Sequence, residues 1–119
     1  MVEAGSRMRN QPAPPHVIFE ALTEPNRDPA RPWLLLLDDE QRPQTTHAQW
    51  PNLVVWSSIW AKRPDAVVRF DLPSDGSGGT QLRWTLLMAE PLPEPSLLGH
   101  LRKRLNQLIN GNLRRTFGQ

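Results

Sequence analysis

Cysteine and tyrosine are both absent from this chain of 119 residues. The missing cysteines exclude disulfides, thiol nucleophiles and cysteine-ligated metal sites. Without cysteine or tyrosine, the chain has no side chain that gains negative charge at moderately alkaline pH. A formal net charge of only +2 therefore accompanies a pI of about 9.9. Such a slight positive excess is not by itself a nucleic-acid footprint. We therefore expect no nucleic-acid partner.

Long hydrophobic runs are also missing. The longest is Trp33–Leu37, which has the length of a strand and not of a membrane-spanning helix. The opening residues MVEAGSRMRN lack the apolar core of a signal peptide. We expect a cytoplasmic protein with no membrane span, and a single domain over residues 1–119. A chain of this length supports one hydrophobic core but leaves little room for a large cavity.

Signatures of catalysis and of metal binding are absent as well. The three histidines His16, His47 and His100 lie far apart and have no acidic companions at metal-ligand spacing. The serines Ser57–Ser58 stand in no G-x-S-x-G motif and have no histidine nearby. The acidic residues Asp38–Glu40 precede a Gln-Arg-Pro sequence, which predicts a solvated turn. We expect no catalytic residue, no metal and no cofactor.

Thirteen prolines are present, and most of them fall where one segment ends and another begins. They set off a short helix at His16–Thr23. Val2–Asn10 alternates weakly and predicts at most an edge strand, because Gly5 weakens it. Trp33–Asp38 and Thr45–Trp50 are predicted as two strands about an acidic turn. A helix stays the alternative for the first of them, since leucine is a good helix former.

The second half of the chain gives the clearest pattern. Three strands are predicted at Leu53–Ala61, Ala66–Leu72 and Thr80–Ala89, followed by a long amphipathic helix from about Pro95 to Thr116. Alternation gives the last two strands a shared apolar face of Val68, Phe70, Leu82, Trp84, Leu86 and Met88. The helix carries a leucine stripe that can pack on this face.

These segments together resemble the SRPBCC superfamily of START-like domains. The resemblance covers nearly the whole chain and rests on PAPPHVIFEALTEP, NLVVWSSIW, the hairpin RPDAVVRFDL…GGTQLRWTLL and the terminal HLRKRLNQLINGNLRRTFG. It implies an α+β helix-grip fold, in which an antiparallel sheet wraps a long C-terminal helix. The family includes proteins like polyketide cyclases or dehydratases and binders of hydrophobic ligands. This chain is shorter than the usual domain and has room for about six strands.

The resemblance and the apolar faces together predict a binding site for a small hydrophobic molecule, lipid-like or polyketide-like, between sheet and helix. The expected lining residues are Trp56, Ser58, Trp60, Phe70 and Trp84 on the sheet side and Leu101, Leu105 and Leu108 on the helix. The tryptophans have a second interpretation, in which they simply fill the core of a small domain. The Ser58 hydroxyl can likewise bind a ligand or the neighbouring backbone.

Two other functions remain open on the sequence. A cyclase-type or dehydratase-type enzyme would need an acid or base inside the cavity. A protein-interaction module, like the Hsp90 co-chaperone relatives of the superfamily, would have a filled core and use its outer surface. The basic residues of the last helix favour a solvated face over an acidic partner; they are Arg102, Lys103, Arg104, Arg114 and Arg115. The oligomeric state is left open.

Overall fold

An antiparallel sheet forms one layer of the structure, a computed structural model that describes residues 1–118. Its five strands lie in the order β1-β5-β4-β3-β2, and every neighbouring pair is antiparallel. The strands are β1 (Val2–Gln11), β2 (Thr45–Gln49), β3 (Leu53–Trp56), β4 (Val67–Asp71) and β5 (Thr80–Met88). The N-terminal strand β1 and the short strand β2 are therefore the two edges of the sheet.

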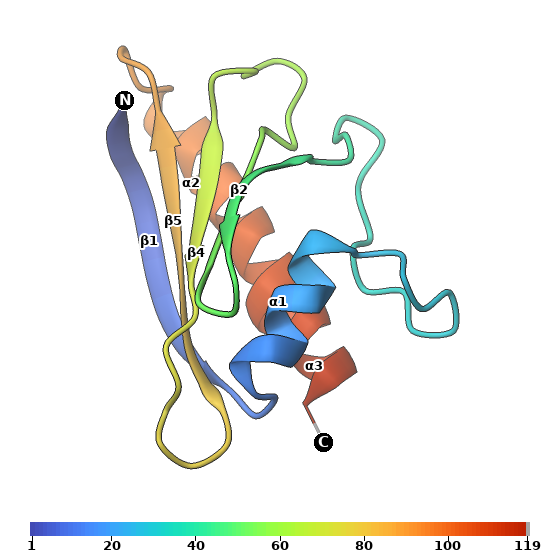
Figure 1. Ribbon diagram of the computed structural model, residues 1–119. Helices are drawn as coiled ribbons and strands as arrows, with labels where there is room; N and C mark the ends of the chain where they lie inside the picture. Colours follow the sequence, from blue (N-terminus) through green and yellow to red (C-terminus); the bar gives the residue numbers. More distant parts are fainter. Residues whose placement is uncertain (119) are drawn as a thin grey trace.

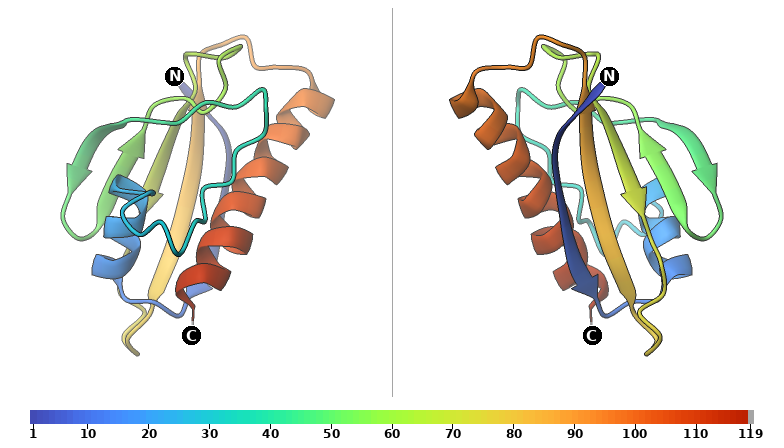
Figure 2. Two further views of the ribbon diagram at one scale, coloured as in Figure 1. Left: turned by 90° about the vertical axis from the view of Figure 1, so that its right-hand side faces the viewer. Right: turned by 90° about the vertical axis from the view of Figure 1, so that its left-hand side faces the viewer.

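A long C-terminal helix crosses one face of this sheet (Figures 1 and 2). It begins as α2 (Pro95–Leu105), continues through the π-helical segment η1 (Asn106–Leu113) and ends as α3 (Arg114–Phe117). The short helix α1 (Pro15–Thr23) begins directly after β1 and carries a proline at its start, where a missing N–H costs no hydrogen bond. The predicted α+β helix-grip fold is confirmed, with five strands in place of about six.

The missing strand is the one predicted at Trp33–Asp38, which is neither strand nor helix. Burial alternates only over its last four apolar residues, because Leu34 and Leu36 pack against the core while Leu35 and Leu37 are exposed. It has no neighbouring strand along its length, however, so its backbone forms no ladder. It belongs to the long connection between α1 and β2, which runs past the C-terminal helix on the open side of the fold (Figure 2).

The strand predicted at Leu53–Ala61 is also shorter than expected, since β3 ends at Trp56. Beyond that point the chain bonds to the long connection and not to β4. The Gln41 N–H donates to the Ile59 carbonyl at 2.8 Å, and Glu40 forms an isolated bridge with Trp60. The residues that follow β3 therefore fasten the connection to the sheet.

The core lies between the sheet and the C-terminal helix, as the patterns of β4, β5 and the helix predict. The shared apolar face of β4 and β5 is buried throughout. On the helix the leucine stripe is buried at Leu98, Leu101, Leu105, Leu108 and Leu113, while Leu97 is exposed. This burial is the main source of stability in such a fold, at roughly 25 cal/mol per Å² of apolar surface removed from water.

Candidate functional site

All eight residues predicted to line a ligand site lie in this core, and each is at most 4% exposed. Trp56 packs edge-on against Phe70 with ring centroids 4.7 Å apart. Trp33, from the long connection, stacks on Trp56 at 6.1 Å. The space in which the sequence predicts a ligand is thus occupied by aromatic rings from three separate segments.

Hydrogen bonds hold two of these rings in place. The Trp56 indole N–H donates to the Leu22 carbonyl of α1 at 2.9 Å. The Trp84 indole N–H donates to Asn106 Oδ1 on the C-terminal helix at 3.0 Å. Buried indole N–H groups need such partners, and each bond here joins the sheet to a different helix. The two rings act as fixed parts of the core.

The Ser58 hydroxyl bonds to neighbouring backbone, which is one of the two interpretations left open by the sequence. Its Oγ accepts the Trp60 N–H at 2.9 Å and lies 3.0 Å from the Trp60 carbonyl, to which it donates. Ser58 is only 3% exposed, so these two bonds satisfy a hydroxyl that has little contact with water. They also shape the turn that follows β3.

A small hollow of about 60 Å³ reaches two of the predicted residues, Trp60 and Leu101. Asp39, Lys62, Arg63, Leu97 and His100 complete its lining. The buried indole N–H groups of Trp33 and Trp60 have no hydrogen-bond partner within the part of the chain that is described. The hollow has room for a few water molecules, whereas pockets for drug-sized ligands measure roughly 300–1,000 Å³.

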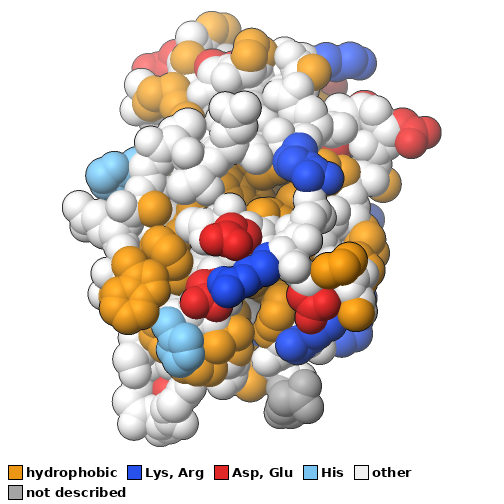
Figure 3. All heavy atoms as spheres, turned by 45° about the vertical axis from the view of Figure 1, so that its right-hand side comes forward, with side chains coloured by type: hydrophobic (Ala, Val, Ile, Leu, Met, Phe, Trp, Pro, Cys, Tyr) orange, Lys and Arg blue, Asp and Glu red, His pale blue; other side chains and the backbone are white. Residues whose placement is uncertain are grey.

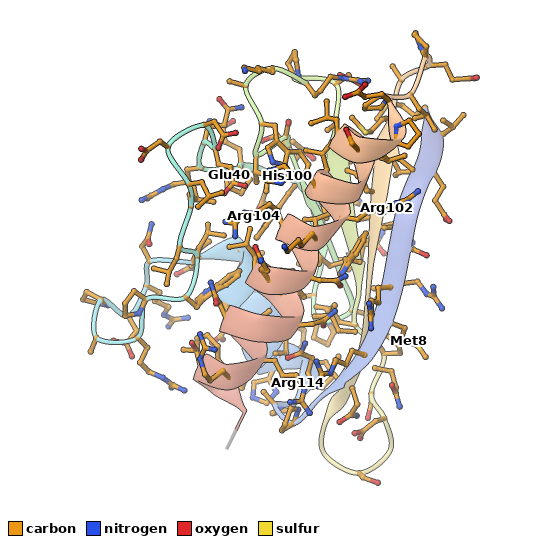
Figure 4. All side chains as sticks on the ribbon, turned by 180° about the vertical axis from the view of Figure 1, so that it is seen from behind. Met8, Glu40, His100, Arg102, Arg104 and Arg114 are labelled. Atoms are coloured by element: carbon orange, nitrogen blue, oxygen red, sulfur yellow. The ribbon has the colours of Figure 1, made fainter. Side chains whose placement is uncertain are left out.

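A buried ion pair that the sequence analysis missed lies beside this hollow. Arg104 Nε and Nη2 donate to the two carboxylate oxygens of Glu40, each at 2.8 Å. Arg104 also donates to Gln107 Oε1 at 2.8 Å and to the Leu35 carbonyl at 3.1 Å. The Leu37 N–H donates to Glu40 at 2.9 Å. Figure 4 shows Arg104 on the helix beside Glu40 of the long connection.

The predictions of a solvated acidic turn and a solvated basic helix face were therefore wrong at these two residues. The Glu40 side chain is 0% exposed and that of Arg104 is 9% exposed. The sequence does contain a signal, because Arg104 stands three residues after Leu101 and four before Leu108, inside the leucine stripe. An arginine at a stripe position indicates a buried partner.

The electrostatics of this pair favour its charged state. Burial raises the pKa of the Glu40 carboxyl, but the hydrogen bonds from Arg104 and the Leu37 N–H outweigh it and hold the pKa below its usual value. The same pairing raises the pKa of Arg104. Because both carboxylate oxygens accept bonds from Arg104, Glu40 is a structural anion and not a free general base.

A groove with positive charge runs along the other side of the helix, next to β1. We call it the basic groove; it measures about 550 Å³ and is lined by Arg7, Arg9, Gly99, Arg102, Lys103, Asn106, Gln107, Asn110 and Gly111. Arg102 Nε donates to the Ala4 carbonyl at 2.8 Å, and Arg114 Nε donates to the Asn10 carbonyl at 3.0 Å. Figure 4 shows Arg102 between helix and strand.

Charge is distributed differently on the face that carries the long connection. There, acidic and basic side chains lie close together among hydrophobic ones (Figure 3). Arg27, for example, pairs with Glu20 of α1 at 3.3 Å and with Glu24 at 3.8 Å. The basic groove differs from this face, because its lining has arginine and lysine but no acidic side chain.

The described residues contain no group of three or more potential ligands that could hold a metal ion, and all three histidines are exposed. Within the same part of the chain, no helix has the length and apolar character needed to cross a bilayer.

Comparison with known proteins gives the fold of the chain. No family model and no curated protein matches it. Among solved structures, the Aha1 dimer from Colwellia psychrerythraea is 15% identical with a TM-score of 0.70, over 98% of this chain and 96% of that one. An HSP90 activator from Plasmodium falciparum, PFC0360w, is 16% identical with a TM-score of 0.60, over 92% and 89%.

CalU16 from Micromonospora echinospora is 18% identical with a TM-score of 0.65, over 92% of this chain and 76% of that one. Identities this low establish a shared fold and leave the function open. They agree with the arrangement found here, in which a sheet encloses a long C-terminal helix. The chain therefore has the helix-grip fold that the sequence resemblance implied.

Proposed function

We propose that the protein is a cytoplasmic, non-enzymatic protein-binding module that uses its outer surface. The observation that supports this function is the packing of Trp33, Trp56, Phe70 and Trp84, each at most 1% exposed, in the space between sheet and helix. A ligand-binding member of such a fold needs that space for its ligand. A binding module needs it only as a core.

The comparisons support the same direction. Two of the similar structures are described as an HSP90 activator and as the Aha1 dimer, and both match this chain over most of their own length. Assisting a protein partner is thus compatible with a chain of this size and fold. A shared fold does not identify the partner of this chain.

Binding of a small hydrophobic molecule is the second candidate. It is favoured by the hollow at Trp60 and Leu101 and by the buried indole N–H of Trp33, which has no hydrogen-bond partner among the described residues. A ligand of appreciable size would have to displace Trp60 and other side chains that line the hollow. Its lining would then be the eight residues that the sequence predicts.

Native mass spectrometry of the purified protein, with extraction of bound small molecules, separates the two candidates. The binding module predicts the mass of the bare chain and no change in melting temperature with a panel of lipids and polycyclic aromatic compounds. A stoichiometric apolar molecule that copurifies, or a dose-dependent rise in melting temperature, would reject the filled core and favour the ligand-binding function.

A further inference from the structure

The basic groove combines cations that form no salt bridge among the described residues with the free edge of a strand. Its lining includes Arg7, Arg9, Arg102 and Lys103 but no aspartate or glutamate. Within the described residues, the salt bridges involve none of these four cations. Arg7, Arg9 and Lys103 are exposed, so their charges face solvent beside the groove.

The free edge belongs to β1, which pairs only with β5. The bonds from Arg102 to the Ala4 carbonyl and from Arg114 to the Asn10 carbonyl show which backbone groups of β1 face away from β5. Because backbone groups alternate along a strand, Ser6 and Met8 direct their N–H and C=O groups to the same free side. The N–H and C=O groups of Ser6 and Met8 thus lie between two carbonyls, of Ala4 and Asn10, that already accept hydrogen bonds from arginines.

The arginine side chains of the strand lie on the helix side of that edge. Arg7 and Arg9 line the basic groove, and Gln11, two residues further, donates from Nε2 to the Ile109 carbonyl at 3.3 Å. A segment placed along Ser6–Met8 would therefore meet cations from β1 on one side and from α2 on the other. Every second side chain of that added segment would point toward these cations.

We propose that the basic groove binds an extended acidic segment of a protein partner, which adds to the sheet as a strand next to β1. The backbone groups of Ser6 and Met8 would pair with the segment, while Arg7, Arg9, Arg102 and Lys103 would pair with its carboxylates. This is strand addition with charge selection, where main-chain bonds give affinity and side chains give specificity. The proposal rests on the proposed function and supplies its site and partner chemistry.

Two other occupants fit the groove less well. Single-stranded nucleic acid is bound by stacking of bases on aromatic rings, and no aromatic residue lines the groove. A second copy of the chain, paired antiparallel about Met8, would set Arg7 of each copy opposite Arg9 of the other. Like charges directly opposite on neighbouring strands are destabilising.

Calorimetric titration with a capped peptide that alternates glutamate and valine tests the proposal. We expect one-to-one binding that weakens with added salt, because the charges involved are exposed. Replacing both arginines, Arg7→Glu with Arg9→Glu, should weaken binding about tenfold or more. The matched control, Arg42→Glu with Lys62→Glu, has the same net charge but changes no groove residue, and should bind like the unmodified protein.

Two further probes keep the test decisive. A peptide of the same sequence, N-methylated on alternate residues so that one edge has no N–H donors, should bind at least about tenfold more weakly if a strand is added. Lys103→Glu lies on the exposed face of the helix and replaces the double variant if that variant does not fold.

Equal binding to the two charge-matched double variants would overturn the proposal, as would equal binding of the N-methylated peptide. Tighter binding of single-stranded DNA would show a nucleic-acid site instead. Dimers that dissociate on Arg7→Glu with Arg9→Glu would show that a second copy takes the groove. Failure of the peptide to bind, with a bare mass in native mass spectrometry, would reject this site and leave the proposed function standing. A copurifying apolar ligand would reject the proposed function itself.

Discussion

Arg104 of α2 and Glu40 of the long connection form a two-point ion pair, although 64 residues separate them in the chain. The pair is buried, and it fastens the long irregular segment between α1 and β2 to the helix that the sheet encloses. That segment also carries Trp33, which stacks on Trp56 in the core. The ion pair therefore helps to hold the segment against the core.

Removing one partner of this pair should be strongly destabilising. Arg104→Met leaves the Glu40 carboxylate buried without its cation, and we expect a loss of about 3–5 kcal/mol in the free energy of unfolding. Urea denaturation measures it. Arg104→Met combined with Glu40→Leu should recover much of the loss, because no charge then remains buried. A double variant as unstable as the single one would show that the pair is not the cause.

Trp60 should behave as a core residue, since it is only 4% exposed. Trp60→Ala is expected to lower the free energy of unfolding by about 3–5 kcal/mol. Trp50, which is 69% exposed, provides the control, and Trp50→Ala should change stability by no more than about 0.5 kcal/mol. A small loss at Trp60, accompanied by altered binding of an apolar ligand, would indicate an open cavity.

The side chain of Arg102 lies close to Gly5, so a larger residue at position 5 should disturb it. A Cβ at position 5 would lie 2.7 Å from Arg102 Nε, so a larger residue has to displace the side chain that caps the Ala4 carbonyl. Gly5→Val is expected to destabilise the protein by about 1–2 kcal/mol. In an Arg102→Ala background the same change should be neutral or stabilising, because valine suits a strand. A double-mutant cycle without coupling would contradict this contact.

Acid should destabilise the protein through Asp65 as well as Glu40. Hydrogen bonds from Arg63 outweigh burial and, with one from the Ala89 N–H, hold the pKa of Asp65 far below its usual value. A carboxyl whose folded pKa is depressed contributes stability above its unfolded pKa. This contribution is lost as the pH falls through about 4 toward the folded pKa.

Urea denaturation from about pH 7 down to about pH 3 checks this expectation. The unmodified protein should lose stability over the lower part of that range. Asp65→Asn should be less stable at neutral pH and should show a shallower decline, because the asparagine has no proton to gain. An unchanged pH profile in that variant would contradict the role of Asp65.

The local patterns predict most of the fold because its elements are amphipathic. The helix predicted at about Pro95–Thr116 matches the observed Pro95–Phe117, and β4 and β5 bury the faces that their alternation indicates. The errors involve long-range partners. Pro32 and the acidic turn favour a strand at Trp33–Asp38, yet a strand requires a neighbouring strand, and the chain provides none there.

The candidate site was predictable to a smaller degree for the same reason. Spacing shows that Arg104 belongs to the leucine stripe, but only the folded chain brings Glu40 to it. The basic groove depends on Arg7 and Arg9 from one end of the chain and Arg102 and Lys103 from the other. Their proximity follows from β1 lying at the sheet edge beside the helix (Figure 2), which no local pattern indicates.

A nuclear magnetic resonance titration tests the central claim most directly, because indole and backbone N–H signals report separately on the interior and the surface. With the acidic peptide, our account predicts shifts at the backbone amides of Ser6–Arg9 and Arg102–Lys103, and unchanged indole signals of Trp56 and Trp84. With apolar compounds it predicts no shift at either tryptophan. Saturable shifts of the Trp56 and Trp84 indoles with an apolar compound, and none at the basic groove with the peptide, would contradict it.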